Sequence, residues 1–321
     1  MSCRPRAMRD VFLEQIWKAM ADDQKLFFVS ADFGSPVLDK IRAGFPSRFI
    51  NVGIAEQNLI NISAGLALEG YTLFTYAIAP FITMRCYEQA RVSLALLSEV
   101  RPMNINLIGV GAGYSYVVSG PTHQCYEDIT LMRALPNFQL LSPADHVTAE
   151  NLFDHCVGKQ GPKYLRFDAQ VLPVIYEQAA PDMETGFHVH RRGDRICLIA
   201  TGYMLHTAFD VAKQLSDEGE EVGVIDLVNL TNYAAERLES VLRSYIGLVS
   251  LEEGFRGRGG LDSMLFEFIA RRNLPTRLLN LGVEPAYRFE LGPRAELHEQ
   301  VGIGVQSVLK SVRDFHKSVV Q

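Results

Sequence analysis

Residues 48–70 read RFINVGIAEQNLINISAGLALEG, a strand signal followed at once by a helix signal. The apolar run at 49–52 ends at Gly53, and apolar or small residues then occur on every side of a helix pattern over about 54–69. A helix that is apolar all round is typical of a buried helix. Glu56 falls in its first turn, at the carboxyl end of the strand, where α/β proteins place ligand sites. A favourable interaction with the helix dipole would also explain this carboxylate.

Strand and helix patterns alternate on both sides of this segment. We expect strands at 25–31, 71–76, 103–110, 138–141 and 163–167, and helices at 9–22, 80–97, 125–134 and 144–158. After a looser stretch at 171–193, we expect strands at 195–200, 221–227, 246–251 and 277–280, and helices at 204–218, 234–243, 260–272 and 303–318. Such alternation is typical of βαβ crossovers. The sequence therefore predicts an α/β protein of two domains (1–172 and 193–321, with a linker at 173–192), each a mainly parallel sheet flanked by helices.

The composition excludes several classes of partner. The chain has 321 residues, of which 48% are hydrophobic and 21% charged, and a formal net charge of −6. This charge gives no attraction to nucleic acid or to an anionic membrane, and no apolar stretch is long enough to cross a bilayer. The five cysteines are scattered without a C-x-x-C pair, and the first ten residues contain no apolar run. We therefore expect no disulfide framework, no signal peptide and a location in the reducing cytoplasm, with no binding to nucleic acid or membranes.

Three short motifs give the chain a family resemblance. They are R-F-x-x-x-G-I-A-E-Q at 48–57, G-P-T-H-Q at 120–124, and E-E-G at 252–254 followed by G-G-L at 259–261. Together they resemble the transketolase and deoxyxylulose-phosphate synthase group of thiamine diphosphate enzymes, over nearly the whole chain. The resemblance implies a pyrimidine-binding domain followed by the C-terminal transketolase domain. On physical grounds alone, we expect the glycines of the third motif in tight turns between strand and helix.

One motif of full-length transketolases is missing. Their first domain carries a G-D-G motif that helps to hold Mg²⁺, the hard cation that the oxygens of the cofactor's diphosphate require; this sequence contains no G-D-G. The resemblance therefore implies a split enzyme, in which a separate N-terminal subunit supplies the diphosphate-binding domain and holds most of the Mg²⁺, and we expect no metal site on this chain. Because the family's active sites lie between domains of different protomers, we expect a heterotetramer in which this chain also self-associates.

The resemblance assigns residues to the cofactor's aminopyrimidine ring. The Glu of the first motif contacts this ring, and a carboxylate that keeps the ring nitrogen N1′ protonated is what thiamine chemistry requires, so Glu56 is the expected catalytic contact. Asp32 matches the Asp of the family's S-A-D segment near the cofactor; a turn-capping role would explain it equally well.

An aromatic side chain is also expected against the ring. Without gaps, the family's stacking aromatics fall on Ala79 and Ile82, and a one-residue shift brings Phe81 into line. We expect Phe81, and also Tyr76, to contact the cofactor, although both are compatible with a plain core role. Arg85, on the same predicted helix, is expected to serve the cofactor site or a subunit interface.

Substrate contacts are expected from three further positions. The family's G-P-T-H-Q histidine touches the substrate or intermediate, a role that we carry to His123, and an Arg for the substrate's phosphate falls on Arg166, where a simple ion pair is also possible. Where the family has an Asp that recognises a donor hydroxyl, this chain has Ser119, and a frequent substrate-binding His is replaced by Gly111. We therefore expect a sugar or sugar phosphate other than the usual donors.

We thus expect the C-terminal subunit of a split transketolase, which transfers a two-carbon ketol unit from a ketose to an aldose and is active only with its partner. One alternative is the β chain of a 2-oxo acid dehydrogenase E1, although its G-x-H-H-S segment is not found here. Another is an enzyme similar to deoxyxylulose-phosphate synthase, which usually keeps both halves on one chain. A non-catalytic regulatory paralogue is disfavoured by the intact Glu56 and His123 and left open by Ser119 and Gly111.

Overall fold

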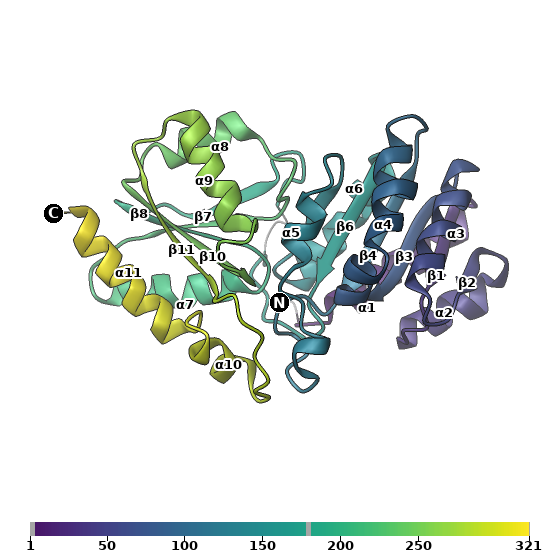
Figure 1. The fold of residues 1–321 in the computed structure, drawn as a ribbon, viewed down its shortest axis with the longest axis horizontal. Helices are drawn as coiled ribbons and strands as arrows, with labels where there is room; N and C mark the ends of the chain where they lie inside the picture. Colours follow the sequence, from purple (N-terminus) through teal and green to yellow (C-terminus); the bar gives the residue numbers. More distant parts are fainter. Residues whose placement is uncertain (1–3, 178–180, 321) are drawn as a thin grey trace. The chain divides into compact units, whose positions relative to one another are not determined.

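The computed structural model describes residues 4–177 and 181–320, which divide into two compact units. The first unit comprises residues 1–112 and 131–180, and the second comprises 113–130 and 181–321. Each unit has its own sheet with flanking helices, so the predicted α/β class with two such domains is confirmed (Figure 1). The segment 113–130, which falls within the first domain by sequence, instead has its contacts in the second unit.

The sheet of the first unit has six strands in the order β2-β1-β3-β4-β6-β5, and every pairing is parallel. Strands β1 and β4 are buried along their whole length, as expected for strands covered on both faces. The strands are β1 (Leu26–Ser30), β2 (Phe49–Asn51), β3 (Thr72–Ile78), β4 (Asn104–Val110), β5 (Gln139–Leu141) and β6 (Gly161–Phe167).

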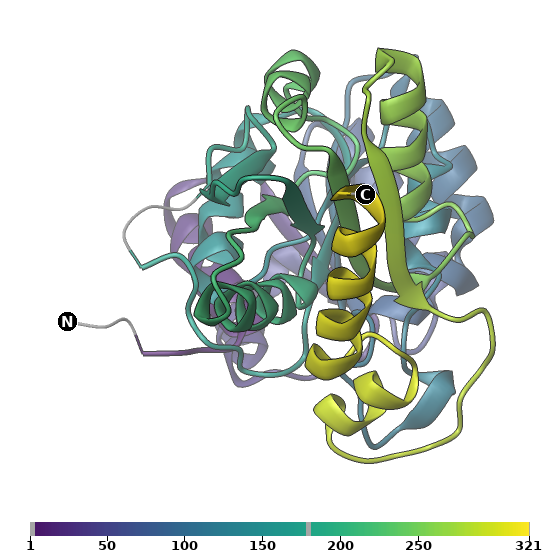
Figure 2. The same cartoon turned by 90° about the vertical axis from the view of Figure 1, so that its left-hand side faces the viewer.

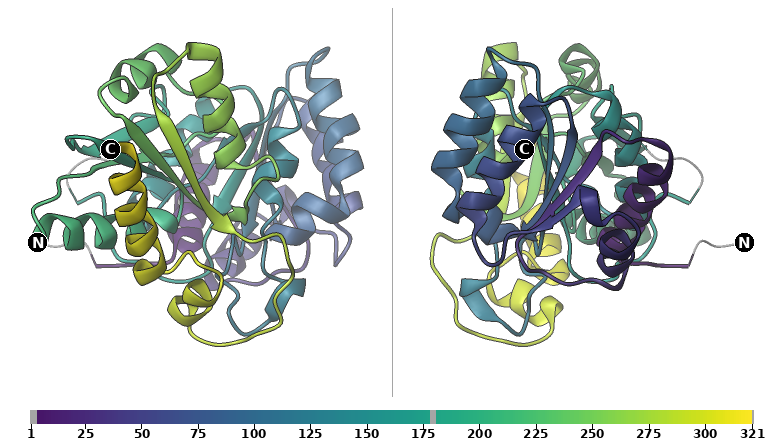
Figure 3. Two further views of the ribbon diagram at one scale, coloured as in Figure 1. Left: turned by 60° about the vertical axis from the view of Figure 1, so that its left-hand side comes forward. Right: turned by 90° about the vertical axis from the view of Figure 1, so that its right-hand side faces the viewer.

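Helices cover both faces of this first sheet (Figure 3, right). Helix α1 (Met8–Asp22) packs with α6 (His146–Gly158) and with α2 (Pro36–Gly44). Helix α3 (Glu56–Leu68) packs on β3 and against the helical run that begins at Phe81. Short helices η1 (Pro46–Arg48), η4 (Gly120–Thr122) and α5 (Asp128–Arg133) lie in the connections.

Helix α2 was not predicted, although the sequence carries its start signal. Ser35 is the N-cap, and its Oγ accepts a hydrogen bond from the backbone N–H of Val37 at 3.2 Å. Pro36 occupies the first helical position, where a missing N–H costs nothing. By itself the Ser-Pro pair indicates a turn, because the apolar run behind it is short.

The strand order creates a switch point between β1 and β3. From β1 the chain passes to its neighbour β2, and then crosses back to β3 on the other side of β1. In open α/β sheets, ligands bind outside the carboxyl ends of the strands at such a point. Asp32, Glu56 and Phe81 follow β1, β2 and β3 respectively, so the three lie at the carboxyl ends of the strands that define it.

The second unit has a five-stranded sheet in the order β11-β10-β8-β9-β7. The pairings among β8 to β11 are parallel, whereas β7 runs antiparallel to β9 at the edge. The strands are β7 (Phe187–Arg191), β8 (Ile196–Ala200), β9 (Gly223–Leu227), β10 (Gly247–Phe255) and β11 (Arg277–Val283). Strand β7 lies inside the range expected to be a linker, because its pairing partner is distant in sequence and leaves no local signal.

The helices of the second unit include α7 (Met204–Asp217) and α11 (Val305–Val320), which pack together (Figure 2). Helix α9 (Leu261–Arg272) packs on β10 and β11, and α8 (Ala235–Leu242) follows β9. Helix α10 (Arg294–Gln300) was not predicted; it is a two-turn helix in a segment without a clear periodic pattern. None of the helices in the described part of the chain meets the length and apolarity needed to span a membrane.

Lys163 on β6 is a buried cation with a perturbed pKa. Its Nζ donates hydrogen bonds to Asn104 Oδ1 at 2.9 Å and to the carbonyl oxygens of Lys159 and Gly161. Burial disfavours the charged form and lowers the pKa of Lys163 from 10.5 to about 8. The folded and unfolded chains therefore differ in proton content at alkaline pH.

We predict that the free energy of unfolding of the wild type, measured relative to that of Lys163→Met, increases as the pH rises above about 8. The unfolded chain then still holds the Lys163 proton that the folded chain has released, so unfolding becomes less favourable with pH, by about 1.4 kcal/mol per unit for one full proton. Denaturant unfolding of both proteins at several pH values measures the difference. Below pH 7 it should be constant, and a difference that stays flat up to pH 10 would contradict the prediction.

Candidate active site

Glu56 is the first residue of α3 and is almost withdrawn from water. Helix α3 begins after the N-cap Ala55, and the preceding turn uses the positive φ of Gly53 (+74°). The side chain of Glu56 is only 5% exposed, and both its carboxylate oxygens accept from Arg85 Nη1, at 3.1 and 3.3 Å. Placement at a helix N-terminus also stabilises the negative charge. The predicted first-turn position is thus observed, together with an ion pair to Arg85.

The charge of Glu56 also affects the neighbouring thiol. Burial, and then the negative charge of Glu56, raise the pKa of Cys86 to about 12. The Cys86 thiol is therefore protonated at neutral pH, and it donates a hydrogen bond to the carbonyl oxygen of Ile82 at 3.0 Å. A neutral thiol beside the carboxylate adds no competing negative charge.

Phe81 and Arg85 lie on one π-helical turn. The single helix expected at 80–97 consists instead of a π-helical turn η2 (Phe81–Arg85), a short α4 (Tyr87–Gln89) and a π-helical segment η3 (Ala90–Leu96). The Arg85 guanidinium carbon lies 3.7 Å from the centre of the half-exposed Phe81 ring, a cation–π contact. A π turn closes one residue later than an α turn. It therefore takes up one extra residue, so the side chains of residues 81–85 are spaced differently from those of the single α-helix that was expected at 80–97.

Tyr76 differs from Phe81 in accessibility. Its side chain is 0% exposed within β3, and its ring stacks on Phe33 at 5.1 Å between centroids. It is therefore a core residue of this unit, and its ring has no face open to a ligand.

Asp32 lies in a strained turn directly after β1, and hydrogen bonds link this turn to Asn51 at the end of β2. Its φ is +47°, a conformation that side-chain-bearing residues seldom adopt and that is often found at functional sites. Asn51 holds it from both sides: Asn51 Nδ2 donates to Asp32 Oδ1 at 2.9 Å, and Asn51 Oδ1 accepts from the backbone N–H of Asp32 at 3.1 Å. The same Asn51 oxygen accepts from the N–H of Gly53 at 2.9 Å, so one side chain fixes the turn before Glu56.

Arg166 on β6 is buried, with 3% of its surface exposed. It pairs in register with Gly109 of β4. Its burial was not indicated by the sequence, which left a phosphate contact and a simple ion pair as alternatives.

His123 and Ser119 belong to the second unit, in the loop 113–125. Hydrogen bonds in both directions between Gly113 and Cys125, each of 3.0 Å, close the loop at its base. Ser119 is exposed and His123 is half-exposed at the end of η4. His123 Nδ1 shares a 2.9 Å hydrogen bond with Thr122 Oγ1, and its ring meets Tyr116 edge-on at 6.2 Å.

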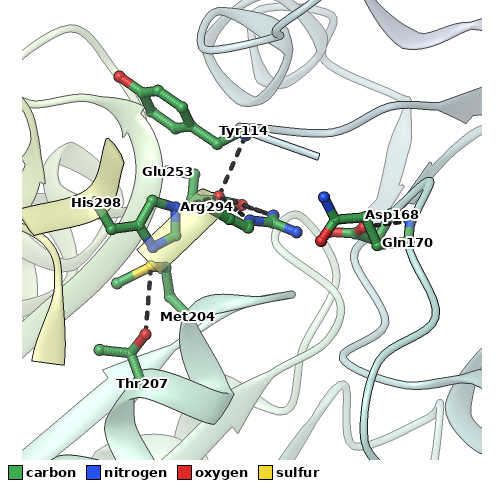
Figure 4. A network of polar contacts seen from close by, with 8 residues as sticks. All are labelled: Tyr114, Asp168, Gln170, Met204, Thr207, Glu253, Arg294 and His298. Carbon is green, nitrogen blue, oxygen red and sulfur yellow. Dashed lines mark hydrogen bonds and ion pairs between the residues drawn. The ribbon is translucent and has the colours of Figure 1, made fainter. Parts of the chain in front are cut away.

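A buried cluster at the base of this loop was not anticipated. Glu253, near the end of β10, accepts hydrogen bonds from Arg294, from His298 and from the backbone N–H of Tyr114 (Figure 4). The E-E-G motif by itself indicates only a turn. The missed signal lies in α10, where Arg294 and His298 are four residues apart and so share one helix face.

The neighbouring Glu252 explains one glycine of the third motif, Gly260, which precedes α9; Gly254 lies inside β10 and not in the predicted turn. Glu252 Oε1 accepts from the backbone N–H of Asp262 at 2.9 Å, in the first turn of α9. A β-carbon at Gly260 would lie 2.2 Å from Glu252 Oε2. Gly260 is thus required for the close approach of a buried carboxylate to a helix N-terminus, and its own φ of −76° is unstrained.

The described residues contain no group of three or more His, Cys, Asp or Glu side chains arranged to hold a metal ion.

Comparison with known families agrees with the arrangement in both units. Residues 4–193 match "Transketolase, pyrimidine binding domain", and residues 186–308 match "Transketolase, C-terminal domain". The chain therefore belongs to the transketolase family, as its motifs predicted, and contains the second and third of the domains expected for a full-length member.

Similar proteins of the same extent are split transketolases. The chain is 29% identical over 303 residues to a subunit of the apulose-4-phosphate transketolase of Actinobacillus succinogenes, with 94% of this chain and 96% of the relative covered. It is 26% identical to a putative transketolase C-terminal section of Methanocaldococcus jannaschii, with 96% of each covered. A solved split-gene transketolase, described as an inactive β4 tetramer, matches with a TM-score of 0.83, 26% identity and coverage of 97% and 98%. The predicted assignment to the C-terminal subunit of a split transketolase is confirmed.

Longer relatives align over about half their length. The transketolase of Campylobacter jejuni matches with a TM-score of 0.79 at 20% identity, over 97% of this chain and 47% of its own, which shows a shared fold. The deoxyxylulose-phosphate synthase of Parasynechococcus marenigrum, a representative of one alternative considered above, is 27% identical over 43% of its own length. That alternative is therefore a more distant relationship than the one to split transketolases.

We predict that Gly260→Ala lowers the free energy of unfolding by about 1–3 kcal/mol, because its methyl group overlaps the Glu252 carboxylate. Gly65→Ala is the matched control: Gly65 lies inside α3, and a β-carbon there would meet nothing within 4 Å. The control should gain about 0.5–1 kcal/mol from the lower chain entropy of alanine. Denaturant unfolding of both variants checks the pair, and equal effects of the two substitutions would contradict the assignment of Gly260.

Proposed function

We propose that this chain binds the aminopyrimidine end of thiamine diphosphate and, with a separate N-terminal subunit, forms a transketolase that moves a two-carbon ketol unit from a ketose to an aldose. The observation that carries the proposal is the buried carboxylate of Glu56 at the switch point of the first sheet. The N-terminal subunit supplies the diphosphate-binding domain and holds the Mg²⁺. The assembly is a heterotetramer in which this chain also contacts its own copy.

Relatives of about the same length as this chain support the proposal that it needs an N-terminal partner subunit. Relatives that match over their whole length are named as one subunit of a transketolase or as a transketolase C-terminal section. The split-gene transketolase of the same extent, composed of β chains alone, is described as inactive. Both facts are expected if half of the cofactor's contacts come from another polypeptide.

The residues around Glu56 fit the cofactor that the family implies. A carboxylate has about four lone-pair sites, so the bonds from Arg85 leave Glu56 able to accept from a protonated ring nitrogen. Thiamine diphosphate, once bound, supplies the nucleophilic carbon for ketol transfer. Glu56 holds the proton on the ring nitrogen, and the burial of its carboxylate strengthens this hydrogen bond. Arg85 fixes the carboxylate's orientation, and Phe81 offers a half-exposed ring for stacking.

Tyr76 and Asp32 are the remaining cofactor candidates, and in this proposal Tyr76 has only an indirect role. Tyr76 has no exposed surface, so it supports the site through Phe33 and does not stack on the cofactor itself. Asp32, held in its strained turn by Asn51, shapes the backbone that leads into Glu56. We propose that its carboxylate faces the cofactor or the subunit interface, the two positions that the family resemblance implies.

Substrate recognition is proposed for His123, Ser119 and Arg166. His123 is half-exposed and hydrogen-bonded to Thr122, which orients its ring for contact with the sugar. Ser119 is exposed and lacks the carboxylate of the usual donor-binding Asp. Because Arg166 is buried, we propose that it reaches a phosphate only after rearrangement. A donor other than the common pentose phosphates follows from these differences.

We predict that Glu56→Gln lowers kcat of the reconstituted enzyme by about 10²-fold or more, because the amide cannot hold a protonated ring nitrogen. The fold should survive, since Arg85, 46% exposed, stays solvated without its partner. Turnover is measured with the N-terminal subunit, thiamine diphosphate and Mg²⁺. Glu69→Gln, at the exposed C-terminal end of the same helix, is the control and should keep wild-type rates. A near-normal rate for Glu56→Gln would remove Glu56 from the active site.

We further predict that thiamine diphosphate is lost from the isolated chain on dialysis and retained by the complex with its N-terminal subunit. A screen of phosphorylated and unphosphorylated ketoses with that complex should give the highest kcat/KM for a donor other than a pentose phosphate, because Ser119 replaces a hydroxyl-binding Asp. Tight retention by the isolated chain would contradict the split site. Pentose phosphates as the best donors would contradict the substrate proposal while leaving the transketolase activity intact.

A further inference from the structure

We propose that Glu253 is a positioning residue for the loop 113–125 that carries Ser119 and His123. It acts from the second unit, held by Arg294 and His298, and does not touch the substrate. This inference rests on the proposed role of His123 in ketol transfer. It assigns to the C-terminal transketolase domain a defined task in substrate recognition.

Glu253 is fully buried, and its hydrogen bonds come from three directions. Its Oε1 accepts from Arg294 Nε at 3.0 Å, from His298 Nε2 at 2.8 Å and from the backbone N–H of Tyr114 at 3.2 Å. Its Oε2 accepts from Arg294 Nη2 at 2.7 Å. Because a carboxylate can only accept, His298 Nε2 must carry a proton. A buried carboxylate is costly without such partners, so this one is held firmly in place.

The loop backbone packs directly against this carboxylate. Gly113 has φ +54°, and a β-carbon at this position would lie 2.2 Å from Glu253 Oε2. The backbone N–H of the next residue, Tyr114, is the one that Glu253 accepts. Gly113 also makes the two hydrogen bonds to Cys125 that close the loop. The carboxylate therefore contacts the base of the loop, where Gly113 and Cys125 are hydrogen-bonded to each other.

Aromatic rings pack around the cluster. The Tyr114 ring meets His298 edge-on at 5.4 Å and Tyr126 at 5.0 Å, and Tyr126 in turn packs on Phe255 of β10 at 5.0 Å. Arg294 lies over the ring of Tyr203, with its guanidinium carbon 3.6 Å from the centroid. Both sides of the loop base are thus packed on elements of the second unit, α10 and β10, so we expect a shift of Glu253 to be transmitted to the loop.

Glu253 acts through His123 and has no direct contact with the sugar, because only 1% of its side chain is exposed. Its effect on the reaction is therefore on the position of the loop. A displacement of about 1 Å at a substrate-contacting group can lower a rate by about 10²-fold. The cofactor contacts proposed for Glu56, Arg85 and Phe81 involve no residue of this cluster.

The test uses Glu253→Gln, with Gly113→Ala as a second variant. Loss of the Glu253 charge leaves Arg294 buried without a counter-ion and so threatens folding. Gly113→Ala keeps every charge of the cluster; its β-carbon displaces the loop backbone from the carboxylate, and its positive φ adds local backbone strain. Glu252→Gln is the matched control: it neutralises an equally buried carboxylate one residue earlier on β10, whose hydrogen bond goes to the start of α9.

Hydrogen exchange of the isolated chain is the first readout, because it needs neither cofactor nor partner. We expect the amides of 113–125, above all that of Tyr114, to exchange at least about tenfold faster in Glu253→Gln, or in Gly113→Ala if the first variant does not fold. Glu252→Gln should leave them at wild-type protection. Unchanged exchange in the loop of a folded variant overturns the inference.

A double-mutant cycle with His123→Ala in the reconstituted enzyme is the second readout. We expect each loop variant to lower kcat by about 10–10²-fold, with unchanged affinity for thiamine diphosphate, and to cause a smaller loss, through Ser119 alone, when His123 is already alanine. Losses that multiply in full in the double variant overturn the inference. Should His123→Ala itself keep the wild-type rate, the proposed role of His123 fails, and hydrogen exchange alone then decides for or against the positioning role of Glu253.

Discussion

A carboxylate that folding removes from water must be matched by positive charge or by N–H donors, and this requirement organises both units of the protein. In the first unit it is met at Glu56 by the N-terminus of α3 and by Arg85. In the second it is met at Glu253 by Arg294, His298 and a backbone amide of the loop 113–125. At Glu252 it is met by the first turn of α9. Each of these carboxylates follows or ends a parallel strand, where helix N-termini and loops supply donors.

The alternation of apolar strands and helices was enough to predict two α/β units, because a parallel strand buried on both faces leaves a continuous apolar run. The position of Glu56 in the first turn of a helix was also predictable, because strand, glycine and apolar helix are adjacent in sequence. The edge strand β7 was not, because its pairing with β9 depends on residues more than thirty positions away. Helix α2 was missed despite the Ser35 cap, since a helix of nine residues carries few periodic positions.

Side-chain environments were harder to predict than elements. Phe81 and Tyr76 were both candidates in the sequence, with Phe81 preferred from its alignment, but burial could not be predicted for either: Phe81 lies half-buried on a π-helical turn and Tyr76 is enclosed by the core. No local sequence pattern distinguished the π turn from the α-helix expected there, because the closing hydrogen bonds of the two differ by only one residue. Likewise, the partnership of Glu253 with Arg294 and His298 joins residues about forty positions apart, and periodicity within a single segment cannot reveal it.

The two arginine–carboxylate pairs differ in a way that matches their proposed tasks. Arg85 is 46% exposed, so its pair with Glu56 is weakened by solvent and can be loosened at small cost. Arg294 is 4% exposed and Glu253 only 1%, so separating them would leave an uncompensated buried charge. A carboxylate that is proposed to accept a hydrogen bond from a coenzyme's ring nitrogen benefits from an arginine that can shift and expose part of the carboxylate oxygens. A carboxylate that holds a loop benefits from an arginine that stays paired with it. The exposure of the arginine, more than the presence of the ion pair, therefore distinguishes the carboxylate proposed to bind the cofactor from the carboxylate proposed to hold the loop.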